Sequence, residues 1–159
     1  MHDNKNIPTL YEWAGGMDVF EKLTAAFYKK VLQDQLLEPL FRHMSDHHQT
    51  QVAHFIAEVF DGPEQYSNDG GTHFKMIQKH FAKHLTELQR KRWIQLLVET
   101  ADEIELPDDP EFRSAFIAYL EWGTRIAVLN SNLDKLKMNP DEPMPKWDWG
   151  VPGKPFEKS

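Results

Sequence analysis

Apolar side chains recur at helical spacing along most of this chain, and no stretch alternates apolar and polar residues as a strand would. The clearest pattern lies in Met17–Gln33, whose apolar stripe consists of Phe20, Leu23, Phe27 and Val31. Similar patterns predict helices over Asp46–Phe60, over His73–His84, from Thr86 onward, and in a last segment that ends at about Asn130. The sequence therefore predicts an all-α fold.

Short sequence signals predict where these helices begin and end. A helical turn at Thr9–Trp13 should end at Ala14-Gly15-Gly16, and Pro39 should begin a small helix that carries Leu40 and Phe41. Ser45 or Asp46 is expected to cap the helix that follows, while Thr86 and Gln89 form a capping-box pattern. Pro63–Thr72 is rich in turn-forming residues and is expected to be a loop.

Composition narrows the class of protein. A chain of 159 residues fits one domain, and the absence of cysteine excludes disulfides, thiolate metal sites and haem attached through CxxCH. A net charge of −7 argues against nucleic acid and anionic membranes as partners. There is no apolar run of membrane length and no signal-peptide core, so we expect a cytoplasmic protein.

The C-terminal part of the chain differs from the rest. Residues 132–159 lack a helical period and hold five of the ten prolines, with Trp147, Trp149 and Phe156 spaced among charges. Either this extension is disordered or its aromatic side chains pack back onto the domain. We therefore predict a flexible N-terminus over 1–8, a helical domain over 9–131 and a Pro-rich extension over 132–159.

The chain has eight histidines but no GxSxG, HExxH, P-loop or GxGxxG motif. Three of these histidines lie within Gly71–Trp93, where His73, His80 and His84 fall on or near one face of the expected helix. Ile77 and Phe81 lie beside His80, so this face is suited to a large apolar ligand. The alternative is a surface helix whose histidines are solvated.

One arrangement that accounts for these residues is a haem pocket. A haem site needs one neutral imidazole as axial ligand, apolar side chains on the opposite side, and polar groups near the bound gas. His80 would be the iron ligand, Phe41 would pack on the ring, and Tyr28 and Trp93 would donate hydrogen bonds to the gas ligand. The apolar cover would come from the helix at 46–60, through Val52, Phe55 and Ile56.

Two other functions are compatible with the same residues. His80 and His84 are spaced i, i+4 and could share a non-haem metal ion, with further ligands from His43, His47, His48 and His54. Alternatively, the helices form an interaction protein that binds no metal. Visible colour separates these possibilities, because a haem protein has a strong Soret band and the others do not.

Several segments of Thr9–Asn130 resemble the truncated haemoglobins, most closely group II. They are TLYEWAGG at Thr9–Gly16, FYKKV at Phe27–Val31, LLEPLF at Leu36–Phe41, VAHFIAEVFDGPEQY at Val52–Tyr66, and KH at Lys79–His80. A tryptophan, Trp93, follows thirteen positions (93 − 80) after His80. The resemblance covers about three quarters of the chain and implies a two-over-two helical sandwich around haem b.

The resemblance also implies roles for single residues. His80 would be the proximal iron ligand, Trp93 and Tyr28 would donate to the bound ligand, and Phe41 would pack on the haem. His48 falls at the distal gate and Val52 at the next inward position; His48 would either contact the ligand or iron, or lie exposed in the first turn of its helix.

The resemblance indicates binding of dioxygen, nitric oxide or carbon monoxide at the iron. Two hydrogen-bond donors slow ligand escape, which favours redox chemistry on bound oxygen, nitric oxide or peroxide over storage. Whether the protein is an enzyme, whether a reductase is its partner, and whether it is a monomer or a homodimer are left open by the sequence.

Overall fold

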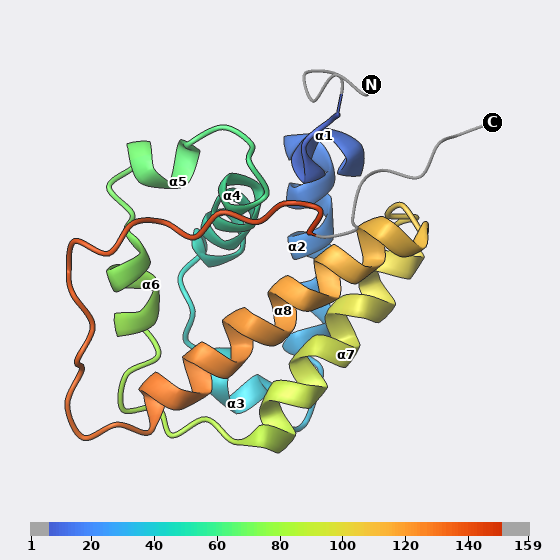
Figure 1. Ribbon diagram of the computed structural model, residues 1–159. Coiled ribbons are helices and arrows are strands. Elements are labelled where there is room, and N and C mark those ends of the chain that lie inside the picture. Colours follow the sequence, from blue (N-terminus) through green and yellow to red (C-terminus); the bar gives the residue numbers. More distant parts are fainter. Residues whose placement is uncertain (1–6, 151–159) are drawn as a thin grey trace.

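The computed structural model describes residues 7–150 and contains helices but no strands over that range, which confirms the predicted all-α class (Figure 1). The helices are α1 (Leu10–Ala14), α2 (Met17–Val31), α3 (Glu38–Phe41), α4 (His48–Val59), α5 (Gln65–Asn68), α6 (His73–Gln78), α7 (Glu87–Glu103) and α8 (Pro110–Ser131). The predictions for residues 1–6 and for Phe156 lie outside the described range. No helix within 7–150 is long and apolar enough to span a membrane.

The long helices form two packed pairs. Helix α2 packs against α4, and α7 lies beside α8; α2 also contacts α7, which joins the two pairs (Figure 1). The largest fully buried side chains between them include Phe20, Phe27, Phe60, Phe112 and Phe116. Burying such rings supplies much of the stability of a domain of this size.

Local signals explain several of the helix boundaries. Thr86 and Gln89 form the predicted capping box, and Thr9 and Glu12 form a second one at α1. Gly15 and Gly16 have φ values of 121° and 93°, a region that glycine adopts without steric cost, and this lets the chain turn sharply into α2. These features belong to the local sequence, and for that reason they were predictable.

Three boundary predictions were wrong. Helix α4 begins at His48 after an N-cap residue, His47, that makes no side-chain capping bond, so neither Ser45 nor Asp46 is the cap. The expected loop at 63–72 contains the helical turn α5, in which Ser67 donates from both its backbone N–H and its hydroxyl to the buried carboxylate of Glu58. Helix α6 ends at Gln78 instead of reaching His84.

A tertiary contact accompanies the non-helical path of the residues that were expected to complete this helix. Ala82 and His84 have φ values of 63° and 50°, which a helix cannot contain. The His84 N–H donates to the Ser131 carbonyl at 3.2 Å, and the Leu85 N–H donates to the Ser131 hydroxyl at 3.0 Å. The C-terminal end of α8 therefore holds residues 84 and 85 in a non-helical path.

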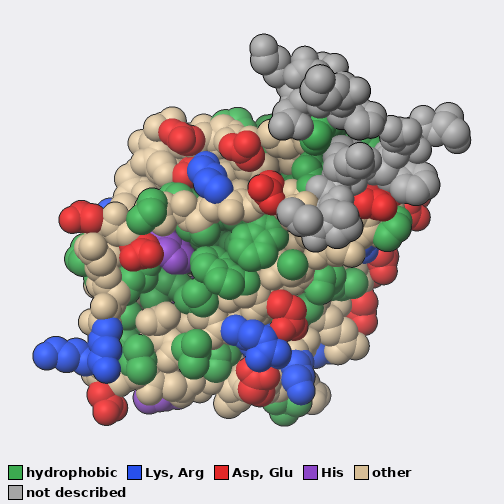
Figure 2. Space-filling view, in the orientation of Figure 1, with side chains coloured by type: hydrophobic (Ala, Val, Ile, Leu, Met, Phe, Trp, Pro, Cys, Tyr) green, Lys and Arg blue, Asp and Glu red, His purple; other side chains and the backbone are tan. Residues whose placement is uncertain are grey.

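The extension folds back onto the helices. After α8 it passes α6 and returns across α4 toward α1 (Figure 1). Trp147 and Trp149 pack against the hydrophobic core, which decides for packing over disorder in residues up to 150. In the same orientation, hydrophobic side chains gather in the middle of this face with a histidine beside them (Figure 2).

Candidate functional site

A cavity of about 440 Å³ lies among α4, α6, α7 and α8. Apolar side chains form most of its wall, and polar groups reach it at a few points. Its volume falls in the range of ordinary ligand sites, roughly 300–1,000 Å³. We call its wall from α2, α3, α4 and α7 the distal wall (Tyr28, Phe41, His48, Val52, Trp93), and residues 73–85 the proximal segment.

The structure brings nearly all of the predicted site residues to this cavity. On its wall lie Tyr28, Phe41, His48, Val52, Phe55, Ile56, Ile77, His80 and Trp93. Phe81 does not line it: this half-buried ring follows His80 in the turn after α6, where the expected helix has already ended.

His80 lies two residues beyond the end of α6 and faces the cavity. Its Nδ1 is 2.9 Å from the Met76 carbonyl oxygen. Because a carbonyl only accepts, Nδ1 carries the proton and Nε2 carries the lone pair; Nε2 has no hydrogen-bond partner within the described range. Burial lowers the pKa of His80, and nearby Lys83 and Lys79 lower it further, so the imidazole is neutral at pH 7.

Polar and aromatic side chains meet on the distal wall. The Nε2 atom of His48 lies 3.2 Å from the Tyr28 hydroxyl, and their ring centroids are 5.0 Å apart. The Phe41 ring lies 5.6 Å from Tyr28 and 5.9 Å from His48. His48 is therefore half-buried in the cavity wall instead of projecting into solvent.

Trp93 joins this group through the core. Phe27 packs edge-on against both Tyr28 and Trp93, with centroid distances of 4.9 and 5.0 Å. Phe27 and Tyr28 are almost completely buried. Two side chains with polar hydrogens, from α2 and α7, are thus fixed against one buried ring.

Burial determines the protonation of the distal groups. It raises the pKa of the Tyr28 hydroxyl, an effect that the Trp93 side chain only partly offsets, so the hydroxyl keeps its proton. Burial also lowers the pKa of His48 to about 4, helped by the positive charges of Lys79 and Lys83. At neutral pH the distal wall therefore offers a phenol O–H, an indole N–H and a neutral imidazole.

Several cavity residues were not predicted from the sequence. Met76 and Leu85 belong to the proximal segment, and Tyr119 and Trp122 come from α8. His73 was expected to share a helical face with His80, and it lines the same cavity from the first turn of α6. A last helix was predicted from the sequence, but only tertiary packing decides which of its residues reach a cavity.

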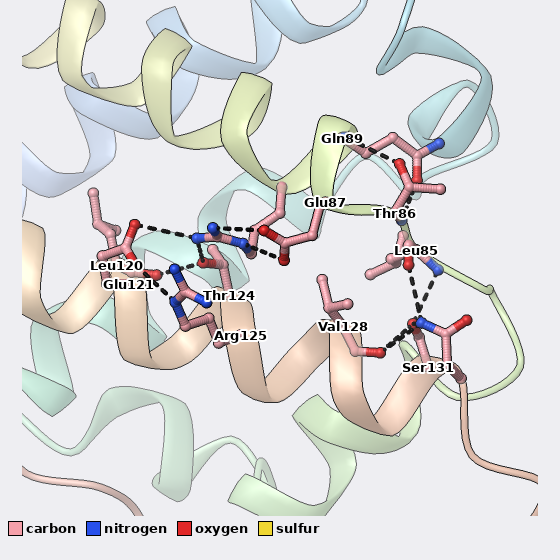
Figure 3. Close-up of polar contacts among 12 residues, drawn as sticks. Leu85, Thr86, Glu87, Gln89, Leu120, Glu121, Thr124, Arg125, Val128 and Ser131 are labelled. Atoms are coloured by element: carbon pink, nitrogen blue, oxygen red, sulfur yellow. Dashed lines mark hydrogen bonds and ion pairs between the residues drawn. The ribbon is translucent and has the colours of Figure 1, made fainter.

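A buried cation closes the cavity between α7 and α8. The Arg90 guanidinium is 5% exposed and donates to the Glu87 carboxylate at 2.8 and 2.9 Å and to Glu121 at 3.2 Å. The ion pair with Glu121 joins α7 to α8, and Figure 3 shows that Arg125 contacts the same Glu121 carboxylate. Each nitrogen of the Arg90 guanidinium donates to a carboxylate within the protein, which indicates a structural role.

The structure does not support the non-haem metal alternative. Because α6 ends at Gln78, His80 and His84 are not one helical turn apart, and His84 is exposed. Within residues 7–150, no group of three or more His, Asp or Glu side chains is arranged to hold a metal ion. A single neutral imidazole opposite hydrogen-bond donors in an apolar cavity instead suits a large, flat cofactor that carries its own metal.

These features define an all-α protein whose cavity fits haem, and comparison with known proteins agrees. The bacterial-like globin family matches residues 9–123. A group 1 truncated haemoglobin from Nostoc sp. (strain MUN 8820) is 35% identical over 98 residues, which cover 54% of this chain and 80% of that protein.

Solved structures share the fold. A haemoglobin from Chloroflexus aurantiacus superposes with a TM-score of 0.67 at 26% identity, covering 76% of this chain and 97% of its own. The group II truncated haemoglobin from Bacillus anthracis has a TM-score of 0.69 at 21% identity, covering 76% and 91%.

The chain belongs to the bacterial-like globin family and is a truncated haemoglobin. It binds haem b and, at the haem iron, a diatomic ligand.

Proposed function

We propose that His80 is the iron ligand and that the protein carries out redox chemistry on the bound diatomic ligand instead of storing it. The observation that carries this proposal is the tautomer of His80: its Nδ1–H donates to the Met76 carbonyl, which leaves Nε2 free at the cavity. A hydrogen bond at the outer nitrogen orients a ligating imidazole and raises its basicity. Haem, when bound, supplies the iron at which the diatomic ligand binds.

The distal wall is proposed to hold that ligand. Tyr28 and Trp93 supply an O–H and an N–H from buried, packed rings. His48 is neutral, so its Nε2 either accepts a hydrogen bond from the Tyr28 hydroxyl or donates one to Tyr28 or to the ligand, depending on tautomer. Donors fixed in advance near a partly negative ligand slow its escape and favour reaction over release.

The remaining cavity residues are proposed to hold the haem itself. Phe41, Val52, Phe55, Ile56 and Ile77 provide apolar contacts, and Phe81 is proposed as a neighbour of the haem edge. Lys79 and Lys83 lie at the cavity and are suited to pair with the two carboxylates of the cofactor.

We place the chain in group II of the truncated haemoglobins because of Trp93. The support is its position on the distal wall beside Phe27 and its spacing from His80. The Nostoc relative is described as group 1 and the Bacillus anthracis structure as group II. The effect of replacing Trp93 on ligand binding therefore tests the group II placement.

The same proposal includes the location, domain organisation and partners of the protein. We infer a cytoplasmic protein with a globin domain over 9–131 and an extension over 132–159, either monomeric or a homodimer. Redox turnover requires a reductase to return the iron to the ferrous state, so a reductase is proposed as partner.

The ultraviolet–visible spectrum of the haem complex, ferric and ferrous, tests the assignment of His80. The wild type should take up one haem and show a normal Soret band, whereas His80→Ala should lose its normal axial ligation. His84→Ala is the matched control and should leave the spectrum unchanged, because His84 is exposed and outside the cavity wall. A His80→Ala protein with the wild-type spectrum would refute the proposal.

A further inference from the structure

We propose that Trp147, in the C-terminal extension, is a positioning residue for the iron ligand: it holds α6, and thereby His80, through a row of packed rings formed by Trp147, Trp122 and His73. The inference rests on the proposed role of His80. It concerns residues beyond the part of the chain that the family match covers, 9–123.

The extension is attached to the last turn of α4. The Trp147 N–H donates to the Val59 carbonyl at 2.8 Å, and the Lys146 ammonium donates to the Glu58 carbonyl at 3.2 Å. Carbonyls in the last turn of a helix lack partners within the helix, and a cation there also interacts favourably with the helix dipole. These two bonds fix the backbone of residue 147 relative to α4.

From this fixed point the Trp147 side chain reaches α8 and, through it, α6. Its ring lies 5.6 Å from both Tyr119 and Trp122. Trp122 in turn stacks on His73, the first residue of α6, at 6.1 Å with an interplanar angle of 15°. The three rings thus connect α4, α8 and α6 in sequence.

His73 depends on this stack for its position. The side chain is 8% exposed, and its Nδ1 is buried without a hydrogen-bond partner among the residues described. Packing against Trp122 is therefore the main interaction that orients the ring. Burial lowers the pKa of His73, partly countered by Glu142 of the extension, so the ring is held mainly as a neutral aromatic.

Helix α6 has few other attachments. It is six residues long, and only His73 and Ile77 on it are buried. A helix this short is unstable by itself in water and takes its position from tertiary contacts. Because Met76 supplies the carbonyl that orients the His80 Nδ1, a shift at His73 is transmitted within one helical turn to the proposed iron ligand.

The test compares two full-length variants that each remove one tryptophan from the extension. Trp147→Ala breaks the stack, whereas Trp149→Ala removes a ring that contacts Trp13 and Phe112 and donates to the Pro8 carbonyl. Trp149→Ala therefore removes a ring of the same kind, and a more deeply buried one, without touching Trp122 or His73. Trp147→Phe keeps a ring at the position and should partly restore the wild-type behaviour.

Three measurements are made on each haem-loaded variant: the rate of haem transfer from the ferric protein to an excess of apomyoglobin, the iron–histidine stretching frequency in the ferrous resonance Raman spectrum, and amide hydrogen exchange over residues 73–83. Trp147→Ala should speed haem loss roughly ten-fold, the scale of effect seen when the support of a metal ligand is removed. It should also shift or broaden the iron–histidine band and accelerate exchange in 73–83.

Equal effects of Trp147→Ala and Trp149→Ala would overturn the proposal, because the extension would then contribute only general stability. Unchanged haem loss and an unchanged iron–histidine band in Trp147→Ala would also overturn it. Failure of the His80 assignment is recognised separately, since His80→Ala would then keep the wild-type spectrum while exchange over 73–83 would still report whether Trp147 holds α6.

Discussion

The distal wall and the proximal segment are built in different ways. The distal wall stands mainly on α2, α4 and α7, which have 12 to 17 residues each, and takes Phe41 from the four-residue α3. Its Tyr28 is 2% exposed, and the neighbouring Phe27 is 1% exposed. The proximal segment has a six-residue helix followed by turns with positive φ at Ala82 and His84. One wall is part of the core, and the other is attached to it.

This difference suggests a division of work between the two walls. Donors fixed by core packing keep their geometry whether or not a ligand is present, as electrostatic preorganisation requires. A proximal histidine held by one carbonyl and a short helix takes its geometry from whatever supports that helix. Substitutions in the two walls should therefore have different effects on the free energy of unfolding, the rate of haem loss and the rate of ligand dissociation.

The largest effect is expected from Phe27→Ala. Phe27 is buried against Tyr28 and Trp93, and truncating such a ring leaves a cavity that costs about 3–5 kcal/mol. The free energy of unfolding, measured by denaturant titration of the haem-loaded protein, should fall by that amount. Haem binding should weaken only as far as the fold itself is lost.

Leu88→Ala is the control for this variant, because Leu88 is 67% exposed and its truncation should change the stability by less than about 0.5 kcal/mol. A Phe27→Ala protein of near wild-type stability would contradict the view that the distal wall belongs to the core.

The same contrast explains what could be predicted from sequence. Most of the distal residues lie on long helices with clear apolar stripes, so periodicity placed Val52 and Phe55 on an inward face correctly. The stripe recognised in 17–33 did not include Tyr28, which the structure buries. The proximal helix was predicted to run to His84 because no glycine or proline follows Gln78 before that point. Residues 84 and 85 are instead held by contacts with Ser131, almost fifty residues away, and no local sequence pattern predicts these contacts.

The extension illustrates the same limit. Packing of its aromatic residues on the domain was one of two alternatives that the sequence left open. No sequence pattern identified Val59 and Trp122 as the partners of Trp147. By contrast, the Thr86–Gln89 capping box lies within four residues and was predicted correctly. A short-range contact of this kind can be read from the sequence, whereas the contacts that Ser131 and Trp122 make with the proximal segment are of long range.

The second prediction concerns the loss of stability at acidic pH. Burial on the distal wall lowers the pKa of His48 from 6.5 to about 4, so between these values the unfolded chain binds a proton that the folded protein resists. Above pH 6.5 His48 is neutral in both the folded and the unfolded state and does not reduce the free energy of unfolding. As the pH falls from 6.5 toward 4, proton binding by the unfolded chain lowers that free energy. Because His48 is partly exposed, the expected loss is about 2 kcal/mol, below the full value of the shift.

Denaturant titrations at several pH values, on the wild type and on His48→Gln, measure this loss. The difference between the two proteins cancels contributions from His80 and the other histidines. Between pH 7 and pH 4 the wild type should lose about 2 kcal/mol more of its free energy of unfolding than His48→Gln loses. Parallel curves across this range would show that His48 is not buried in the distal wall as described.

The third prediction concerns the contribution of the Trp93 N–H to ligand binding. Trp93→Phe keeps a ring against Phe27 but removes the indole N–H, and a lost hydrogen bond of about 1.4 kcal/mol corresponds to a ten-fold change in rate. Dioxygen dissociation from the ferrous protein, followed by stopped-flow mixing, should become about ten-fold faster. The iron–histidine band should not move, because the proximal segment is untouched.

Dissociation as slow after Trp93→Phe as before would remove the basis both for the group II placement and for redox chemistry over storage. Tyr28→Phe separates the second donor, since it deletes the hydroxyl that faces His48 and leaves the buried ring in place.

The smallest effect is expected on the proximal side, from Thr72→Ala. The Thr72 hydroxyl accepts from the Lys75 N–H at 3.0 Å and caps α6. Losing such a cap costs about 1 kcal/mol, or roughly a five-fold increase in local opening. Amide exchange over residues 73–80 and haem loss should both accelerate, while dioxygen dissociation stays as in the wild type.

Thr86→Ala removes an equivalent cap, in which the Thr86 hydroxyl accepts from the Gln89 N–H at 3.1 Å. Because α7 has 17 residues and packs on both α2 and α8, the same loss should only fray its first turn and leave haem loss unchanged. Equal effects of the two cap variants on haem loss would mean that α6 is no more weakly held than α7. In that case the contrast between the two walls would not determine how the protein holds its haem.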